Sequence, residues 1–339
     1  MSIKNLIRPN IAKLVPYSSA RSEYTGTDGT FLDANENPYG VLNRYPDPQQ
    51  KKLKQKLSSI KNVPVENIFI GNGSDEVIDL AIRIFCKPGI DKILTFTPTY
   101  GIYNVAANIN DVEVISLPLD RNFQVDFDGL KEVLENEQIK IIFICSPNNP
   151  TGNCLHSLHY IIDNFKGLIF LDEAYVDFSM YPSALVYVNK VSNLIISQTL
   201  SKAYGLAAAR IGIAYASAEI IGLYNKVKPP YNVSSLNQEA AIKALSAKGK
   251  YKRQLQKIIE QRDKLRLDLE EIPSVIKIHP TEANFFLVEF TDADKTYDHL
   301  VKEHVITRNR NSVIKDCIRI TVGSKKENKK LIAALNKIV

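Results

Sequence analysis

The sequence predicts an α/β protein whose large domain has a mostly parallel central sheet flanked by helices, joined to a smaller α+β domain. Two observations predict it. From about residue 67 to residue 216, short apolar runs typical of buried strands alternate with segments of helical periodicity. After Ala218 a long charged helical stretch and short mixed segments replace that alternation. We expect three parts: an N-terminal arm with part of the small domain (1–44), a large domain (45–230) and a small C-terminal domain (231–339).

Within the large domain, each apolar run is bounded by turn residues, which separates strands from helices. The predicted strands are 67–70, 92–96, 111–117, 141–144, 168–171, 194–196 and 213–216, with helices at 48–60, 77–85 and 127–137. The small domain is predicted to hold helices at 235–271, 293–304 and 325–338 and strands at 275–278, 285–290, 305–308 and 317–322.

Composition and charge restrict the class of protein. The 339 residues, 45% hydrophobic and 24% charged, are enough for one large domain or two ordinary ones. A net charge of +6, spread along the chain, predicts no nucleic-acid partner but would steer an acidic substrate favourably. The apolar runs are too short for a membrane span, and the N-terminus lacks a signal-peptide pattern. Four cysteines without framework spacing favour a reduced, cytoplasmic protein, and His156 and His159 lack further ligands, so no metal is expected.

Polar residues follow directly after several buried strands, at the sheet edge where open α/β proteins bind ligands. Asn149, Asp172 and Lys202 are in this position. An acidic residue at the end of an apolar strand is costly unless it is paired, so Asp172 is a metal ligand or the partner of a buried cation. Lys202 is a candidate for Schiff-base chemistry, because a partly desolvated amine is easier to deprotonate. Taken alone, Lys202 would more simply be a surface lysine.

A glycine-rich turn, Gly71–Glu76, lies between a strand and a helix and is suited to an anion. Its glycines let the backbone approach a ligand, Ser74 or Asp75 can cap the helix, and the exposed N–H groups attract negative charge. The absence of a Walker lysine from this turn excludes a nucleotide P-loop. The other candidates for holding a phosphate are Thr199, Ser201 and Arg210.

Eight motifs occur in a specific order and spacing: residues 32–38, 44–47, 71–76, 98–101, 146–152, 172–175, 199–210 and 318–323. Together they resemble the pyridoxal-phosphate-dependent aminotransferases of the aspartate-aminotransferase fold (fold type I), and among these the histidinol-phosphate aminotransferases. The resemblance covers essentially the whole chain. It implies that the large domain binds pyridoxal 5'-phosphate.

The resemblance also implies a role for each motif residue. Lys202 would carry the cofactor covalently as a Schiff base and move a proton, Asp172 would keep the pyridine nitrogen protonated, and Tyr175 with Asn149 would bind the phenolic oxygen of the ring. Tyr100 would stack on the ring. The cofactor phosphate would be held by Ser74, Asp75, Glu76, Thr199, Ser201 and Arg210, and by Tyr45 from the other subunit of a homodimer.

The implied reaction transfers the amino group of L-histidinol phosphate to 2-oxoglutarate, giving imidazole acetol phosphate and L-glutamate in histidine biosynthesis. Arg319 resembles the arginine that binds the substrate anion, and either Arg308 or Arg310 resembles a second one. The remaining positions that match residues near the substrate are Tyr17, Asn35 and Tyr231.

Two other functions remain open from the sequence. A related enzyme with the same site, such as an aromatic amino acid aminotransferase or a threonine-phosphate decarboxylase, would share these motifs. A cofactor-binding regulator without turnover is the third possibility. The intact set of Lys202, Asp172 and Tyr175 argues against it, and no DNA-binding module is attached.

Overall fold

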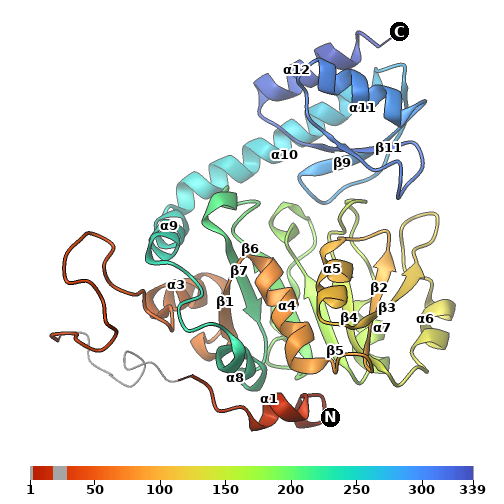
Figure 1. Cartoon of the computed structure of the whole chain (residues 1–339). Helices are drawn as coiled ribbons and strands as arrows, with labels where there is room; N and C mark the ends of the chain where they lie inside the picture. Colours follow the sequence, from red (N-terminus) through yellow and green to blue (C-terminus); the bar gives the residue numbers. More distant parts are fainter. Residues whose placement is uncertain (1–2, 18–28, 339) are drawn as a thin grey trace.

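A computed structural model describes residues 3–17 and 29–338. Its large domain is built on a seven-stranded sheet in the order β1-β7-β6-β5-β4-β2-β3 (Figure 1). Only β7 runs antiparallel to its neighbours, so the sheet is mostly parallel, as the alternating sequence pattern predicts. The strands are β1 (Ile68–Asn72), β2 (Lys92–Thr97), β3 (Glu113–Pro118), β4 (Ile139–Cys145), β5 (Leu168–Asp172), β6 (Leu194–Thr199) and β7 (Ile211–Tyr215).

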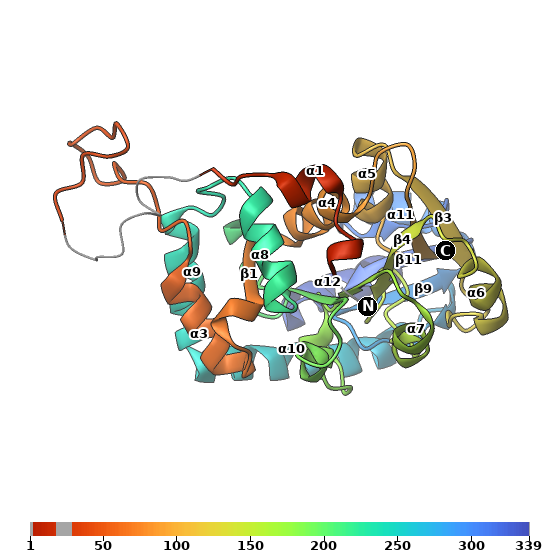
Figure 2. The same cartoon turned by 90° about the horizontal axis from the view of Figure 1, so that it is seen from below.

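Helices cover both faces of this sheet. Successive strand residues point to opposite faces, so Phe69 lies in one hydrophobic core while Ile68 and Ile70 lie in the other. The first core is covered by α1 (Pro9–Lys13), α4 (Ser74–Phe85), α5 (Ile102–Ile109) and α8 (Ala218–Val227). The second is covered by α3 (Lys51–Lys61), α6 (Phe127–Val133), α7 (Leu158–Asn164) and α9 (Ser235–Ser246). Seen from below, α1, α4 and α5 lie on one side of the sheet and α7 on the other (Figure 2).

The small domain has its own antiparallel sheet and its own core. The strand order is β10-β11-β9-β8, and the long helix α10 (Lys248–Glu270) leads into this domain from α9 (Figure 1). Phe286, Val288 and Phe290 of β9 point to the helices, and Leu265 of α10 and Leu331 of α12 close the core. The remaining elements are β8 (Val275–Ile278), β9 (Phe285–Phe290), α11 (Ala293–Lys302), β10 (Arg308–Asn309), β11 (Cys317–Thr321) and α12 (Lys325–Leu335).

The boundary between the domains differs from the one expected at residues 230 and 231. Val233, Ala241 and Leu245 are buried in the core of the large sheet, whereas the second core begins at Leu265. The expected single helix over 235–271 is two helices, which meet at Ala247. We therefore place the boundary inside α10, because a domain is defined by the core its side chains share.

The N-terminal segment also differs from expectation, because its described part packs on the large domain and not on the small one. Ile3, Leu6 and Ile11 are buried against α4 and α8. Residues 29–45 form an arm that leaves the body of the molecule (Figure 1). Apolar side chains on this arm are exposed, including Leu32 at 89% and Val41 at 99%.

Within the described ranges, no helix is long and apolar enough to cross a membrane.

The core of the small domain yields a test of how its sheet is held. Ile320 is 1% exposed beside Arg319, so Ile320→Ala should lower the free energy of unfolding by about 2–5 kcal/mol. Urea denaturation followed by circular dichroism measures this loss. Ile276→Ala is the matched control, because Ile276 lies in the same sheet but is 59% exposed. Equal losses for the two variants would contradict the assigned core.

Candidate active site

A cavity of about 210 Å³ opens at the carboxyl edge of the large sheet. The loops that follow β1, β2, β4, β5 and β6 converge there, because the carboxyl ends of parallel strands meet at one edge. Eleven residues expected from the sequence line it: Ser74, Asp75, Tyr100, Asn149, Asp172, Tyr175, Thr199, Ser201, Lys202, Arg210 and Arg319. Cys145, Ala174 and Ala207 complete the lining.

Asp172 ends β5 and is 2% exposed. Its Oδ2 accepts a hydrogen bond from the Tyr103 hydroxyl at 2.8 Å, and its Oδ1 accepts one from the backbone N–H of Ala174 at 3.0 Å. Burial raises the pKa of Asp172 to about 6, although both hydrogen bonds and the charge of Lys202 act to lower it. The carboxylate is therefore ionised above about pH 6 and can bind a buried cation. Within the described part of the chain, no group of residues that could ligate a metal occurs.

Lys202 lies in the loop after β6, with Nζ 5.5 Å from the centre of the Tyr175 ring. Burial lowers the pKa of Lys202, and the positive charge of Arg319 lowers it further. Burial raises the pKa of Tyr175, so this phenol keeps its proton. The site thus pairs an amine that loses its proton more easily than usual with a neutral hydroxyl group.

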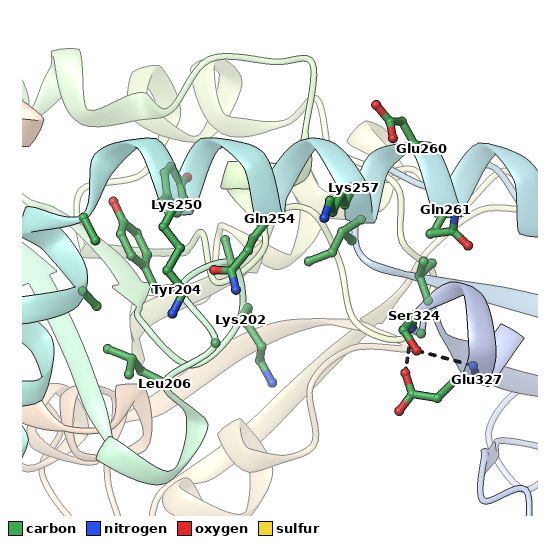
Figure 3. A pocket seen from close by; sticks show the side chains of 18 of the residues that line it. Lys202, Tyr204, Leu206, Lys250, Gln254, Lys257, Glu260, Gln261, Ser324 and Glu327 are labelled. Carbon is green, nitrogen blue, oxygen red and sulfur yellow. Dashed lines mark hydrogen bonds between the residues drawn. The ribbon is translucent and has the colours of Figure 1, made fainter.

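Lys202 also lines a second, wider cavity of about 1060 Å³ between the domains (Figure 3). Helix α10 forms one wall, with Lys250, Gln254 and Lys257 along it, and the start of α12 at Ser324 forms another. The lysines of this wall are exposed, whereas the smaller cavity gathers buried polar groups. We therefore assign the chemistry to the smaller cavity, because size alone does not identify an active site.

The turn before α4 lets a ligand approach its backbone closely. Gly73 is the N-cap with φ of +84° and gives no side-chain cap, so the expected capping by Ser74 or Asp75 is wrong. A Cβ on Gly73 would lie 2.5 Å from a guanidinium nitrogen of Arg210, and one on Gly212 would overlap the backbone of the turn. The structure gives no acceptor for the backbone N–H groups of residues 74–76 among the described residues. An uncapped helix N-terminus of this kind attracts an anion.

Side chains around this turn divide between the cavity and the protein beneath it. Asp75 accepts a hydrogen bond from Tyr100 at 3.2 Å and lies 3.4 Å from Arg210, so its carboxylate orients both residues. Arg210 itself is held in the left-handed region, with φ of +49°. The Glu76 carboxylate turns away from the cavity and accepts hydrogen bonds from the backbone N–H of Asn72 and the side chain of Asn232.

Thr199 and Ser201 close the opposite side of the turn. The Thr199 hydroxyl lies 3.0 Å from the Ser201 hydroxyl and accepts a hydrogen bond from the Ser201 backbone N–H at 3.1 Å. Thr199 is the last residue of β6 and pairs with Gly212 of β7, which fixes its position beside the turn. The hydroxyl groups and the N-terminus of α4 therefore face one small volume.

Three arginines from the small domain form a cluster with no carboxylate in ion-pair range among the described residues. Arg308 of β10 lies directly opposite Arg319 of β11, which places two like charges in a cross-strand pair. Arg319 donates to Asn149 of the large domain, but its Nε and that of Arg310 are buried without a partner. Burial and mutual repulsion lower the pKa of both Arg310 and Arg319. Such a cluster is suited to bind an anion.

Besides Glu76, Arg308 and Arg310, four expected residues do not line the cavity of a single chain. Tyr45 stacks on Tyr231, with ring centres 4.4 Å apart, on the side of the molecule from which the arm leaves. Asn35 lines a hollow against the start of α9, and Tyr17 lines another beside α8. The structure of one chain therefore leaves the roles of these four residues as predictions.

Tyr103 and Cys145 are parts of the site that the sequence analysis did not identify. Tyr103 is fully buried and bonds to Asp172, and Cys145 of β4 is the register partner of Asp172. The Pro98-Thr99-Tyr100-Gly101 motif indicated Tyr100 as a site residue. Tyr103 follows three positions later, in the first turn of the next helix, and therefore lies on the same side of that helix as Tyr100. A buried tyrosine at that spacing is the one local signal that could have been used.

The fold and the site are those of the aminotransferases of fold type I, and comparison with known proteins agrees with this class. The family model of aminotransferase class I and II matches residues 30–335, so the chain belongs to this family.

Individual relatives are more specific. The histidinol-phosphate aminotransferase of Bacteroides fragilis (strain YCH46) is 51% identical, with 99% of each chain covered. The solved histidinol-phosphate aminotransferase from Clostridium acetobutylicum has a TM-score of 0.79 at 25% identity, covering 90% of this chain and 97% of that one. The enzyme from Sinorhizobium meliloti, solved in complex with pyridoxal-5'-phosphate, has a TM-score of 0.80 at 24% identity, covering 90% and 89%, and supports the fold alone.

Proposed function

We propose that the chain is a histidinol-phosphate aminotransferase. It transfers the amino group of L-histidinol phosphate to 2-oxoglutarate, reversibly, and yields imidazole acetol phosphate and L-glutamate in L-histidine biosynthesis. The observation that carries the proposal is the cavity lined by Lys202, Asp172 and Arg319, where the buried Nε of Arg319 has no partner among the described residues. Relatives of this name with about half their residues identical over the full length support it.

The residues present fit pyridoxal 5'-phosphate. The uncapped N-terminus of α4, with Thr199, Ser201 and Arg210 beside it, suits the cofactor phosphate. The ionised Asp172 suits a protonated ring nitrogen, and Lys202 suits the cofactor aldehyde because its pKa is lowered. When bound, the cofactor supplies an electron sink for the negative charge that develops on the substrate α-carbon.

The protein's own groups then hold the reactants and move the proton. Lys202 would hold the cofactor through its Nζ amine and would move a proton at the substrate α-carbon. Asp172 would keep the ring nitrogen protonated, Tyr175 and Asn149 would donate hydrogen bonds to the ring oxygen, and Tyr100 would pack on the ring. The backbone N–H groups of residues 74–76 bind the cofactor phosphate.

The arginine cluster binds the substrate phosphate. A phosphate monoester carries close to two negative charges near neutral pH, so one guanidinium does not offset its desolvation. The pairing of Arg308 with Arg319, and the orphaned Nε of Arg310, provide three guanidinium groups at one end of the small sheet. The same Arg319 binds the α-carboxylate of glutamate.

The functional unit is a homodimer in the cytoplasm. Within one chain Tyr45 and Tyr231 lie outside the catalytic cavity, and the arm exposes apolar side chains such as Leu32 and Val41. Exposed apolar residues on an arm favour contact with a second copy. Tyr45 then reaches the cofactor phosphate of the partner, and Tyr17, Asn35 and Tyr231 lie near the substrate.

Covalent attachment of the cofactor tests the central assignment. Borohydride treatment of the holoenzyme should fix pyridoxal phosphate to the peptide that contains Lys202, as identified by mass spectrometry. Lys202→Ala should abolish the label and reduce turnover by several orders of magnitude. Lys250→Ala is the control, since Lys250 lines only the wider cavity and should keep the label. A label on another lysine would exclude this role for Lys202.

The arginine cluster predicts the substrate preference. Arg319→Ala should lower kcat/KM for L-histidinol phosphate by roughly thirty-fold to several-thousand-fold, and Arg308→Ala and Arg310→Ala by roughly tenfold each, because they are less enclosed. The effect on histidinol, which has no phosphate, should be much smaller. Arg253→Ala, at an exposed position of α10, is the control. An unchanged preference in all three variants would overturn the substrate, and assays with phenylalanine and threonine phosphate would then identify the related enzyme.

Sharing of the site between subunits can be tested by complementation. Subunits with Tyr45→Phe and subunits with Lys202→Ala should, when mixed and exchanged, form heterodimers with one intact site. Their activity should exceed the sum of the two separate preparations. No gain after subunit exchange has been verified by native mass spectrometry would show that each chain builds its site alone.

A further inference from the structure

Among the described residues, Tyr103 is the side chain whose hydroxyl donates to the Asp172 carboxylate. It lies in the first turn of α5, is 0% exposed, and donates to Oδ2 of Asp172 at 2.8 Å. Its ring stacks on Phe143 of β4, with centres 4.8 Å apart and planes at 19°. It also meets the edge of Tyr100 at 5.7 Å. Packing on two sides fixes the ring, and the hydroxyl therefore has little freedom to leave Asp172.

The hydrogen bonds of Asp172 fix the plane of its carboxylate. Ala174 holds Oδ1 and Tyr103 holds Oδ2, so rotation about the side-chain bond would break both contacts. A carboxylate oxygen accepts more than one hydrogen bond, and Asp172 lines the cavity. Its remaining acceptor capacity is thus available to a donor in the cavity.

We propose that Tyr103 is a positioning residue that keeps Asp172 ionised and aimed at the ring nitrogen of the cofactor. It acts through Asp172, since Tyr103 itself does not line the cavity. The inference rests on the proposed function, because that function supplies the cofactor. A hydrogen bond to an ionised acceptor is stronger than one to a neutral group, which gives this contact its leverage.

Several ionisable groups face Asp172, and within the described part of the chain Tyr103 alone donates to it through a side chain. The others are Asp75 from α4, Tyr100 before α5, Cys145 from β4, and Tyr175 and Lys202 from the loops after β5 and β6. Burial raises the pKa of Asp172 to about 6, and the Tyr103 hydrogen bond is the largest of the effects that oppose this rise. Burial raises the pKa of Tyr103 well above its usual value, so the hydroxyl stays protonated.

The sign of the pH effect follows from these contacts. Without the Tyr103 hydroxyl the pKa of Asp172 rises further, so the carboxyl group is neutral over more of the range between pH 6 and pH 8. A neutral carboxyl group does not pair with a protonated ring nitrogen. Cofactor affinity should therefore fall as pH is lowered, and the fall should begin at a higher pH in the variant.

The experiment titrates pyridoxal 5'-phosphate into the full-length apoprotein between pH 5.5 and 8.5, followed by absorbance. Tyr103→Phe should weaken binding by about tenfold near pH 6.5 and by less at pH 8.5, with the midpoint of the affinity–pH curve shifted upward. Ionisation of the free cofactor is common to both proteins and cancels in the difference. In an Asp172→Asn background, Tyr103→Phe should add no further change to the pH dependence.

Tyr224→Phe is the matched control. Tyr224 is also fully buried in the same core, and its hydroxyl donates to the Val77 carbonyl at 2.9 Å and not to Asp172. It should lose comparable stability in urea denaturation without moving the pH midpoint. An unshifted midpoint for Tyr103→Phe, or an equal shift for Tyr224→Phe, would overturn the inference while leaving the proposed function intact. Failure of the unmodified protein to bind the cofactor would overturn both.

Discussion

The burial of the Asp172 carboxylate is the constraint on which the rest of the site depends. Strand β5 lies between β4 and β6 and is buried along its whole length, so its last residue cannot reach bulk water. A buried charge persists only if neighbouring groups stabilise it. Those neighbours come from different elements: Tyr103 from α5, Ala174 from the next turn and Lys202 from the loop after β6. The parallel order of the strands brings them together, and the pKa values of Asp172 and Lys202 follow from that enclosure.

Local sequence patterns predicted the part of this site that depends on position along a strand. Asp172, Asn149 and Lys202 each follow an apolar run, and parallel strand ends share one sheet edge, so their convergence needed no knowledge of distant contacts. Tyr103 could not be found this way. Its role depends on α5 packing over β4 so that the ring rests on Phe143, a contact between residues forty positions apart. The prediction that Ser74 or Asp75 caps α4 was wrong for a related reason. The capping position is Gly73, where a side chain would overlap Arg210.

The same distinction between local patterns and distant contacts explains which parts of the fold were predicted correctly. Buried parallel strands are near-continuous apolar runs and were predicted within a few residues, whereas the domain boundary was misplaced. Pro229 and Pro230 follow the end of α8 at the expected boundary, but Val233 and Ala241 return to the core of the large sheet. The strand expected at 305–308 is the two-residue β10, because Arg308 and Asn309 alone pair with β11. Residues distant in sequence share a core, so prolines indicate turns more reliably than they indicate domain boundaries.

An anion bound at the proposed arginine site would connect the two domains. Arg308 and Arg319 are held opposite each other by the strand register, and the core that fixes β11 is separate from the core of the large sheet. Their repulsion is therefore built into the small domain and costs free energy until an anion lies between them. Arg319 also reaches across to Asn149, in the loop after β4, and β4 borders the strand that carries Asp172. An anion that relieves the repulsion consequently binds both domains at once, and a doubly charged phosphate relieves more of it than a singly charged carboxylate.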